Sequence, residues 1–366
     1  MPRRLLLLGG SVLCAWLAVR ALPTAPTSAI TESISRSAPD PRPRGHVRLA
    51  GEWRELVALC EKGGDAESLK RRLAETKERW LLEEPEVLAG VIGQLLRQGD
   101  DAATGIPFET GPGGALRGWP TLRVFLLDML AVTDPDLAGG IAREVLAGTG
   151  SAEEFAVALK PLLLGGPWQA PAAELEGHFS RLLGNPAWQD KVGLAEALDL
   201  SRNAALPGTT AALARWVDRA PPAAEAGIMA LHETAAAHPK LALELIASDG
   251  TLFNAQPGLR ASLLARATIS DPEQAAGIEH YLRNPAIPVS EKQQFLALFP
   301  LRSASTGFRL YGSPPSPFDG AAVRADDRAA LDAAGRWKTD PAMAELGTAL
   351  QSLEQRLQGW VRQGGD

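Results

Sequence analysis

Histidine is the side chain that most often transfers protons or binds metals near neutral pH, and this chain of 366 residues contains five. They are His46, His178, His232, His238 and His280. A zinc protease needs a second histidine four residues after the first, on the same helical face, but the position four residues after His232 is Ala236. Glu279–His280 likewise has no second ligand at helical spacing. The sequence therefore predicts no metal site.

The common motifs for nucleophiles and cofactors do not occur in this sequence. It has no Gly-x-Ser-x-Gly turn, no Ser-x-x-Lys with its partner motifs and no dinucleotide fingerprint. The glycines from Gly111 to Gly114 are not followed by Gly-Lys-Ser/Thr, so they do not form a phosphate loop. Of the two cysteines, Cys14 lies in an N-terminal apolar run, and Cys60 is typical of a small core residue. We therefore predict no cofactor and no disulfide framework.

Carboxylates leave one enzymatic alternative open. The adjacent pairs Glu153–Glu154 and Asp326–Asp327 fall at or near expected helix starts, where the helix dipole alone explains them. A glycosidase built on a ring of helices, however, uses two carboxylates that are distant in sequence and form no local motif. An extracytoplasmic hydrolase of this α-toroid type, with carboxylates or His280 in a central cleft, therefore stays as the alternative function.

The segment 302–320 is the best local candidate for binding. It carries Phe308, Leu310, Tyr311 and Phe318 among several prolines, and Tyr311 is one of only two tyrosines in the chain. Packing onto the helices is the simpler interpretation of these side chains. An aromatic loop that crosses a helical array can instead offer an edge for a partner peptide, and we predict a partner-binding loop at these four residues.

The N-terminus has the pattern of a targeting segment. Arg3 and Arg4 precede an apolar run of 15 residues, Leu5–Val19, which is short for a membrane span but typical of a secretory signal. We predict that residues 1–29 are a signal peptide, or alternatively a membrane anchor, and that the protein is periplasmic or secreted. Residues 30–45 are rich in proline and poor in apolar residues, which predicts a disordered linker.

Charge argues against nucleic acid as a partner. The formal net charge is −6. The longest basic cluster of the body, Lys70–Arg72, is followed by glutamates at helical spacing, which is typical of a solvated helix face. The chain therefore lacks the basic stripe that draws proteins onto DNA or RNA.

The sequence of the body of the chain predicts an all-α fold. Hydrophobic residues make up 45% of the sequence, Ala and Leu dominate, and apolar positions recur with helical rather than strand periodicity. Gly, Pro or Asn separates the periodic stretches. Helices are predicted at 47–62, 66–82, 85–98, 119–132, 135–147, 152–164, 171–184, 186–202, 209–219, 222–237, 239–248, 257–268, 272–283, 290–299, 321–336 and 341–362.

Helix starts carry recognisable signals. Capping boxes are predicted at Ser151 with Glu154, Ser270 with Glu273, and Ser290 with Gln293. A polar residue followed by proline also recurs, because proline fits the first helical position without losing a hydrogen bond. Pro239 and Pro272 are 33 residues apart, about the length of one helix pair. Other intervals are irregular, so the fold class is an irregular α-solenoid of antiparallel helix pairs.

This texture resembles HEAT and tetratricopeptide repeat proteins, but the residues match neither consensus, so no family is assigned. The expected organisation is an N-terminal helical unit at 46–100, a Gly/Pro-rich connection at 101–118, and a helical repeat body at 119–366 with its irregular loop at 302–320. We predict a non-catalytic, protein-binding scaffold of the cell envelope, which contacts membrane only through an uncleaved N-terminal segment.

Overall fold

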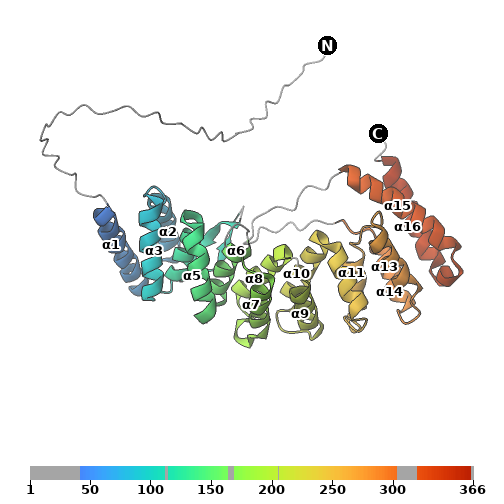
Figure 1. Cartoon of the computed structure of the whole chain (residues 1–366), viewed down its shortest axis with the longest axis horizontal. Helices are drawn as coiled ribbons and strands as arrows, with labels where there is room; N and C mark the ends of the chain where they lie inside the picture. Colours follow the sequence, from blue (N-terminus) through green and yellow to red (C-terminus); the bar gives the residue numbers. More distant parts are fainter. Residues whose placement is uncertain (1–41, 112–113, 164–168, 205, 303–319, 364–366) are drawn as a thin grey trace, which may run out of the picture. The chain divides into compact units, whose positions relative to one another are not determined.

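The computed structural model describes residues 42–111, 114–163, 169–204, 206–302 and 320–363. Within these ranges the chain folds into sixteen α-helices, two 3₁₀ helices and one two-stranded antiparallel sheet (Figure 1). The prediction of an all-α chain is confirmed. The expected signal or anchor at 1–29 lies outside the described residues.

The elements follow the chain in this order: α1 (Arg42–Glu61), α2 (Ala66–Trp80), α3 (Pro85–Gln98), β1 (Glu109–Thr110), β2 (Leu116–Gly118), α4 (Leu122–Thr133), α5 (Pro135–Gly148), α6 (Ala152–Leu163), α7 (Ala172–Gly184), η2 (Pro186–Trp188), α8 (Val192–Ala204), α9 (Pro207–Asp218), α10 (Ala224–Ala237), α11 (Pro239–Ser248), α12 (Pro257–Leu264), α13 (Pro272–Arg283), α14 (Val289–Leu298), α15 (Gly320–Thr339), η3 (Pro341–Leu346) and α16 (Gly347–Gln363).

Each predicted helix overlaps one observed α-helix, with differences at some ends. Helix α1 begins at Arg42, inside the stretch that we expected to be linker, because Pro43 falls in the first turn, where a missing N–H is tolerated. The predicted helix 186–202 begins instead with the 3₁₀ helix η2, and α8 starts only at Val192. The predicted helix 341–362 is likewise divided into η3 and α16.

The three predicted capping boxes have different outcomes. The Ser151 hydroxyl accepts a hydrogen bond from the Glu154 amide at 3.1 Å, as predicted, but the Glu154 carboxylate turns to other partners. At α13 the cap is Asp271 rather than Ser270, because Asp271 directly precedes Pro272 and reaches the next two amides. Ser290 does not cap α14, whose N-cap residue is Pro288.

The expected Gly/Pro-rich connection contains a small hairpin. Strand β1 pairs antiparallel with β2, and an isolated bridge joins Ala103 to Thr121. Gly118 is needed here, because a Cβ at this position would lie 2.2 Å from the carbonyl oxygen of Pro107. The next residue, Trp119, is buried against Phe125 with 5.4 Å between ring centroids. The hairpin therefore anchors this connection to α4.

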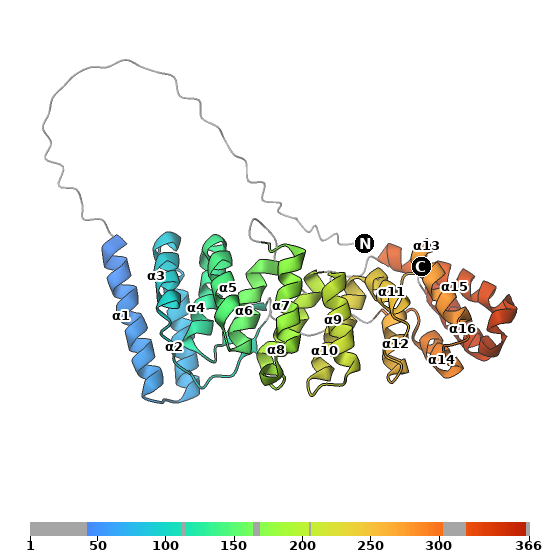
Figure 2. The same cartoon turned by 60° about the horizontal axis from the view of Figure 1, so that its bottom comes forward.

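The helices pack mostly against close neighbours in the chain. Contacts join α4 to α6, α6 to α8, α8 to α10, α10 to α12 and α12 to α14, and they also join α7 to α9, α9 to α11 and α11 to α13. Neighbouring helices therefore lie side by side in both views (Figures 1 and 2). None of the helices in the described ranges has the length and apolar character needed to cross a lipid bilayer.

Candidate functional site

The residues predicted to bind a partner, Phe308, Leu310, Tyr311 and Phe318, lie outside the described residues, so that prediction stays open. His280, the histidine considered for a hydrolase, lies on α13 and lines a cavity. In the ranges that the structure describes, no group of three or more His, Cys, Asp or Glu side chains is arranged to hold a metal ion.

The cavity that His280 lines has a volume of about 460 Å³ and is bounded by α11, α12 and α13. Its walls are mainly apolar, and their members are Leu243, Ile246, Ala247, Leu264 and Ile287. Its polar side chains include Lys240, Glu244 and Glu273, together with His280. This volume and this division of apolar walls from a few polar groups are typical of sites that bind a small molecule or a partner side chain.

A buried ion pair lies at one side of this cavity. Arg260 donates two hydrogen bonds to the carboxylate of Glu291, each 2.7 Å long, and the side chains are 3% and 0% exposed. The Tyr281 hydroxyl donates to the same carboxylate at 2.9 Å. Arg260 also donates to the carbonyl oxygens of Gly250 and Leu252. Arg260, Glu291 and Tyr281 together therefore link α12, α13 and α14 to the loop before α12.

The titration of these groups argues against acid–base chemistry by Tyr281. Burial, and then the negative charge of Glu291, raise the pKa of Tyr281 far above its ordinary value. The hydrogen bond to Glu291 raises the pKa of Arg260. Both groups therefore keep one charge state across the physiological range, and they form a fixed wall rather than a proton donor.

The charged side chains at the cavity neutralise one another. Lys240 donates to Glu273 at 2.6 Å and lies 3.8 Å from Glu244, and its hydrogen bond to Glu273 raises its pKa. About half or more of the surface of each of these three side chains is exposed to solvent. Two carboxylates that share a lysine differ from the opposed acid and base of a glycosidase. The arrangement is better suited to orienting a bound group than to cleaving one.

A serine and a histidine also meet beside this region, on α12 and α10. The Ser262 hydroxyl lies 3.4 Å from His232 Nε2, and Arg266 Nε lies 3.5 Å from His232 Nδ1. Because a guanidinium can only donate, Nδ1 must be the acceptor and the ring proton must be on Nε2. His232 then donates to Ser262, whose own proton goes to the Leu259 carbonyl. This pair therefore lacks the general base that a nucleophilic serine needs.

Burial, and then the charge of Arg266, lower the pKa of His232 to about 4. The ring is consequently neutral at physiological pH. Its role in the folded protein is to connect α10 with α12 through hydrogen bonds.

Arginine–glutamate pairs recur at one sequence separation. Within the described ranges, four such pairs have the glutamate 31 residues after the arginine, and they are Arg123–Glu154, Arg143–Glu174, Arg202–Glu233 and Arg260–Glu291. Each pair joins a helix to the helix two positions along, namely α4 to α6, α5 to α7, α8 to α10 and α12 to α14. We call these four pairs the Arg–Glu ties. The pair Arg260–Glu291 beside the cavity is one member of this set.

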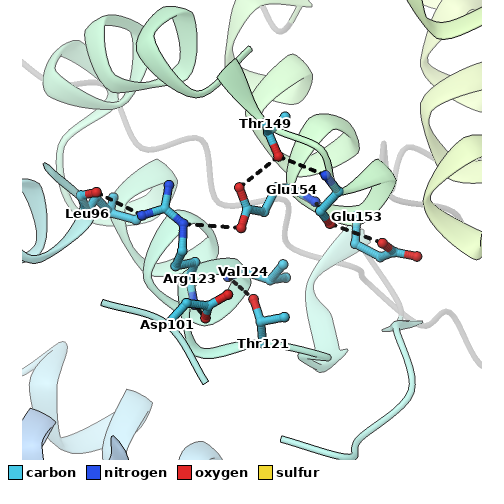
Figure 3. Close-up of polar contacts among 9 residues, drawn as sticks. Leu96, Asp101, Thr121, Arg123, Val124, Thr149, Glu153 and Glu154 are labelled. Carbon is cyan, nitrogen blue, oxygen red and sulfur yellow. Dashed lines mark hydrogen bonds and ion pairs between the residues drawn. The ribbon is translucent and has the colours of Figure 1, made fainter. Parts of the chain in front are cut away.

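In the Arg123–Glu154 tie, both side chains form further hydrogen bonds besides the ion pair (Figure 3). Arg123 Nε donates to Glu154 at 3.1 Å, and a second guanidinium nitrogen donates to the Leu96 carbonyl at 2.8 Å. The second carboxylate oxygen of Glu154 accepts from the Thr149 hydroxyl at 2.9 Å. The hollow of about 330 Å³ beside this tie is lined by groups that already hold one another. We therefore assign Arg123 and Glu154 a structural role.

Sequence reasoning missed both the cavity and the Arg–Glu ties. The cavity residues come from three helices, and no local motif joins them. The ties did leave a signal, because the separation of 31 residues can be counted in the sequence itself. Finding it requires comparing residues one helix pair apart instead of looking for short motifs.

No family model, curated protein or solved structure matches this chain. The functional argument therefore depends on the chemistry of the described residues.

Proposed function

We propose that the protein is a non-catalytic helical repeat protein of the cell envelope and that it acts as a protein-binding scaffold. In this proposal the helices from α1 onward form an irregular α-solenoid of antiparallel pairs. The contacts between every second helix and the four Arg–Glu ties, each spanning 31 residues, support the repeat arrangement.

A short sequence similarity supports the same proposal. Helix α5 begins at Pro135 and ends at Gly148, within the sequence EVLAGTG of residues 144–150. Helix α11 begins at Pro239 and ends at Ser248, within the sequence ELIASDG of residues 244–250. When the two sequences are aligned, the glutamate, the alanine and the last glycine are identical. The two residues after the glutamate are aliphatic in both sequences. The two helices therefore provide matched positions for comparison.

The observation that carries the binding function is the cavity between α11, α12 and α13. Its apolar walls are held by the rigid Arg260–Glu291 pair, and its opening carries charged side chains that face solvent. A preformed apolar pocket with a polar rim is how protein interfaces bury an anchoring side chain. The occupant that we propose is an apolar side chain of a partner protein.

The test uses alanines in exposed positions, so that folding is little affected. Ala247 and Ala286 line the cavity and are exposed, and tryptophan at either position would fill it. Ala147 is the matched control, because it occupies the position on α5 that corresponds to Ala247 and is also exposed. Tagged full-length protein is crosslinked in its native host, and the recovered proteins are identified by mass spectrometry.

We expect Ala247→Trp and Ala286→Trp to lose the stoichiometric partner that the wild type and Ala147→Trp recover. Equal recovery with all four proteins would reject the cavity as the binding site. Recovery of no stoichiometric partner by the wild type would reject the scaffold function itself.

The proposed location is tested separately. Arg3, Arg4 and the apolar run Leu5–Val19 support export from the cytoplasm. Fractionation and N-terminal sequencing should find a protein in the envelope that begins near Ile30, or an uncleaved protein in the membrane fraction. A cytosolic protein that retains Met1 would refute this part of the proposal.

A further inference from the structure

A second hollow, between α2 and β2, has a different chemistry from the cavity. Its volume is about 770 Å³. Apolar side chains contribute Ala74, Leu81, Leu116 and Trp119. The charged side chains that line it are four basic residues, Lys70, Arg71, Lys77 and Arg117, and two acidic residues, Glu67 and Glu78. Basic side chains therefore outnumber acidic ones in the lining itself, although two of them pair with Glu109 and Asp128, which lie outside it.

The two lysines of this hollow are bound by carboxylates of the protein. Lys70 pairs with Glu109 at 2.5 Å, and Lys77 pairs with Asp128 at 2.5 Å. The Trp119 indole nitrogen also donates to Asp128, and the Lys77 ammonium lies 5.5 Å from the centre of the Trp119 ring. These contacts fix one wall of the hollow and leave the lysines little capacity for an external ligand.

The two arginines differ from the lysines. Arg71 and Arg117 are exposed, and neither forms an ion pair with another residue of the described part of the chain. Arg71 is on α2, whereas Arg117 is on β2, where its side chain lies over Gly111 so closely that a Cβ there would be 2.5 Å from its Nε. Two guanidinium groups from different elements therefore line one hollow and keep their donors for solvent or a ligand.

We propose that the hollow between α2 and β2 binds an acidic segment of a partner protein. Arg71 and Arg117 bind its carboxylates, for which the planar guanidinium is geometrically suited, and Leu81 and Leu116 contact an apolar side chain beside them. The inference rests on the proposed scaffold function and specifies the chemistry of one partner segment. The two arginines select the occupant, because a carboxylate can accept two parallel hydrogen bonds from one guanidinium.

The chain supplies a matched control on the same helix. Arg72 is adjacent to Arg71 and is also exposed, but it lines a different hollow, where its neighbours include Glu52 and Glu55. The variants are Arg71→Gln, Arg117→Gln, their combination, and Arg72→Gln. All change exposed side chains, so circular dichroism should show the same helix content in each.

The probe is a fluorescein-labelled peptide of about ten residues, glutamates with two central leucines, and its binding to the purified full chain is measured by fluorescence anisotropy. We expect each of the first two single variants to weaken binding about fivefold to tenfold, and the double variant by more. Arg72→Gln should stay within about twofold, and affinity should fall with added salt, because these charges are exposed.

Three results would overturn the proposal: equal affinity for a peptide with glutamine in place of glutamate, equal loss with Arg72→Gln and Arg71→Gln, or tighter binding of single-stranded DNA of the same length. The cavity experiment separates the two levels of inference. Loss of the partner with Ala247→Trp, together with no binding of the acidic peptide, would retain the scaffold function and reject this site.

Discussion

Replacing Glu291 with glutamine should destabilise the part of the fold around α12–α14 by about 3 kcal/mol. Glutamine keeps the size of the side chain, and its amide oxygen can still accept from Tyr281 and Arg260. Its amide nitrogen, however, would face the second donor of Arg260, so the change removes the negative charge together with one of the two Arg260–Glu291 hydrogen bonds. It leaves the guanidinium of Arg260, whose side chain is 3% exposed, buried without its counter-ion.

The magnitude follows from what Arg260 retains. Removing one member of a buried ion pair costs about 3–5 kcal/mol. Arg260 keeps its hydrogen bonds to the Gly250 and Leu252 carbonyls and to Asn254, so the loss should fall at the lower end. Arg260→Met should cost more, because it also removes the donor from those acceptors and leaves the carboxylate of Glu291 buried.

The matched control is Glu144→Gln. The Arg97–Glu144 pair also joins two helices, but its side chains are 54% and 53% exposed, so its loss should cost less than about 1 kcal/mol. Urea unfolding followed by circular dichroism measures the total stability. Amide hydrogen exchange in α12 and α14 locates the loss, since repeat proteins can unfold in parts. Equal effects of Glu291→Gln and Glu144→Gln would refute the argument from burial.

Two further sets of variants test other contacts. The pKa of His232 is lowered from its ordinary value of 6.5 to about 4 in the folded protein, so between these pH values the unfolded chain binds the proton more readily. The free energy of unfolding should therefore decline by about 3 kcal/mol as the pH falls from 6.5 to 4. His232→Gln should flatten this part of a pH series of urea midpoints, and an unchanged slope would contradict the assignment. Gly193→Ala should cost about 1–3 kcal/mol, because its Cβ would lie 2.3 Å from the backbone of Ala152. Gly140→Ala, which has open space and helical backbone, should instead stabilise by about 1 kcal/mol, and a thermal scan showing the opposite order would refute both.

Helix positions were predictable because their signals are local. Apolar periodicity and a proline at the first helical position act within a few residues, and Pro135, Pro239 and Pro272 each begin a helix where expected. Errors arose where two local signals competed. Ser270 and Asp271 are both good caps, and the one next to the proline has the geometry to reach the free amides.

The hairpin and the candidate sites were not predictable by the same means. Strands β1 and β2 have two and three residues, too few for an alternating pattern to be recognised. Arg71 belongs to a basic cluster that looks like an ordinary solvated face, and only the position of β2 shows that Arg117 lines the same hollow. The cavity beside Arg260 similarly depends on which helices pack together, which the sequence of each helix does not specify.

The Arg–Glu ties also bear on how the length of this chain can change. In each tie the arginine precedes the glutamate by 31 residues, so the segment between them must keep a fixed spatial span. Removing a few residues within a helix of that segment rotates one partner away from the other, because each residue turns a helix by about 100°. Gain or loss of a complete helix pair leaves the orientation of the remaining partners unchanged. Variation in length among related chains is therefore expected in the loops or in steps of one helix pair.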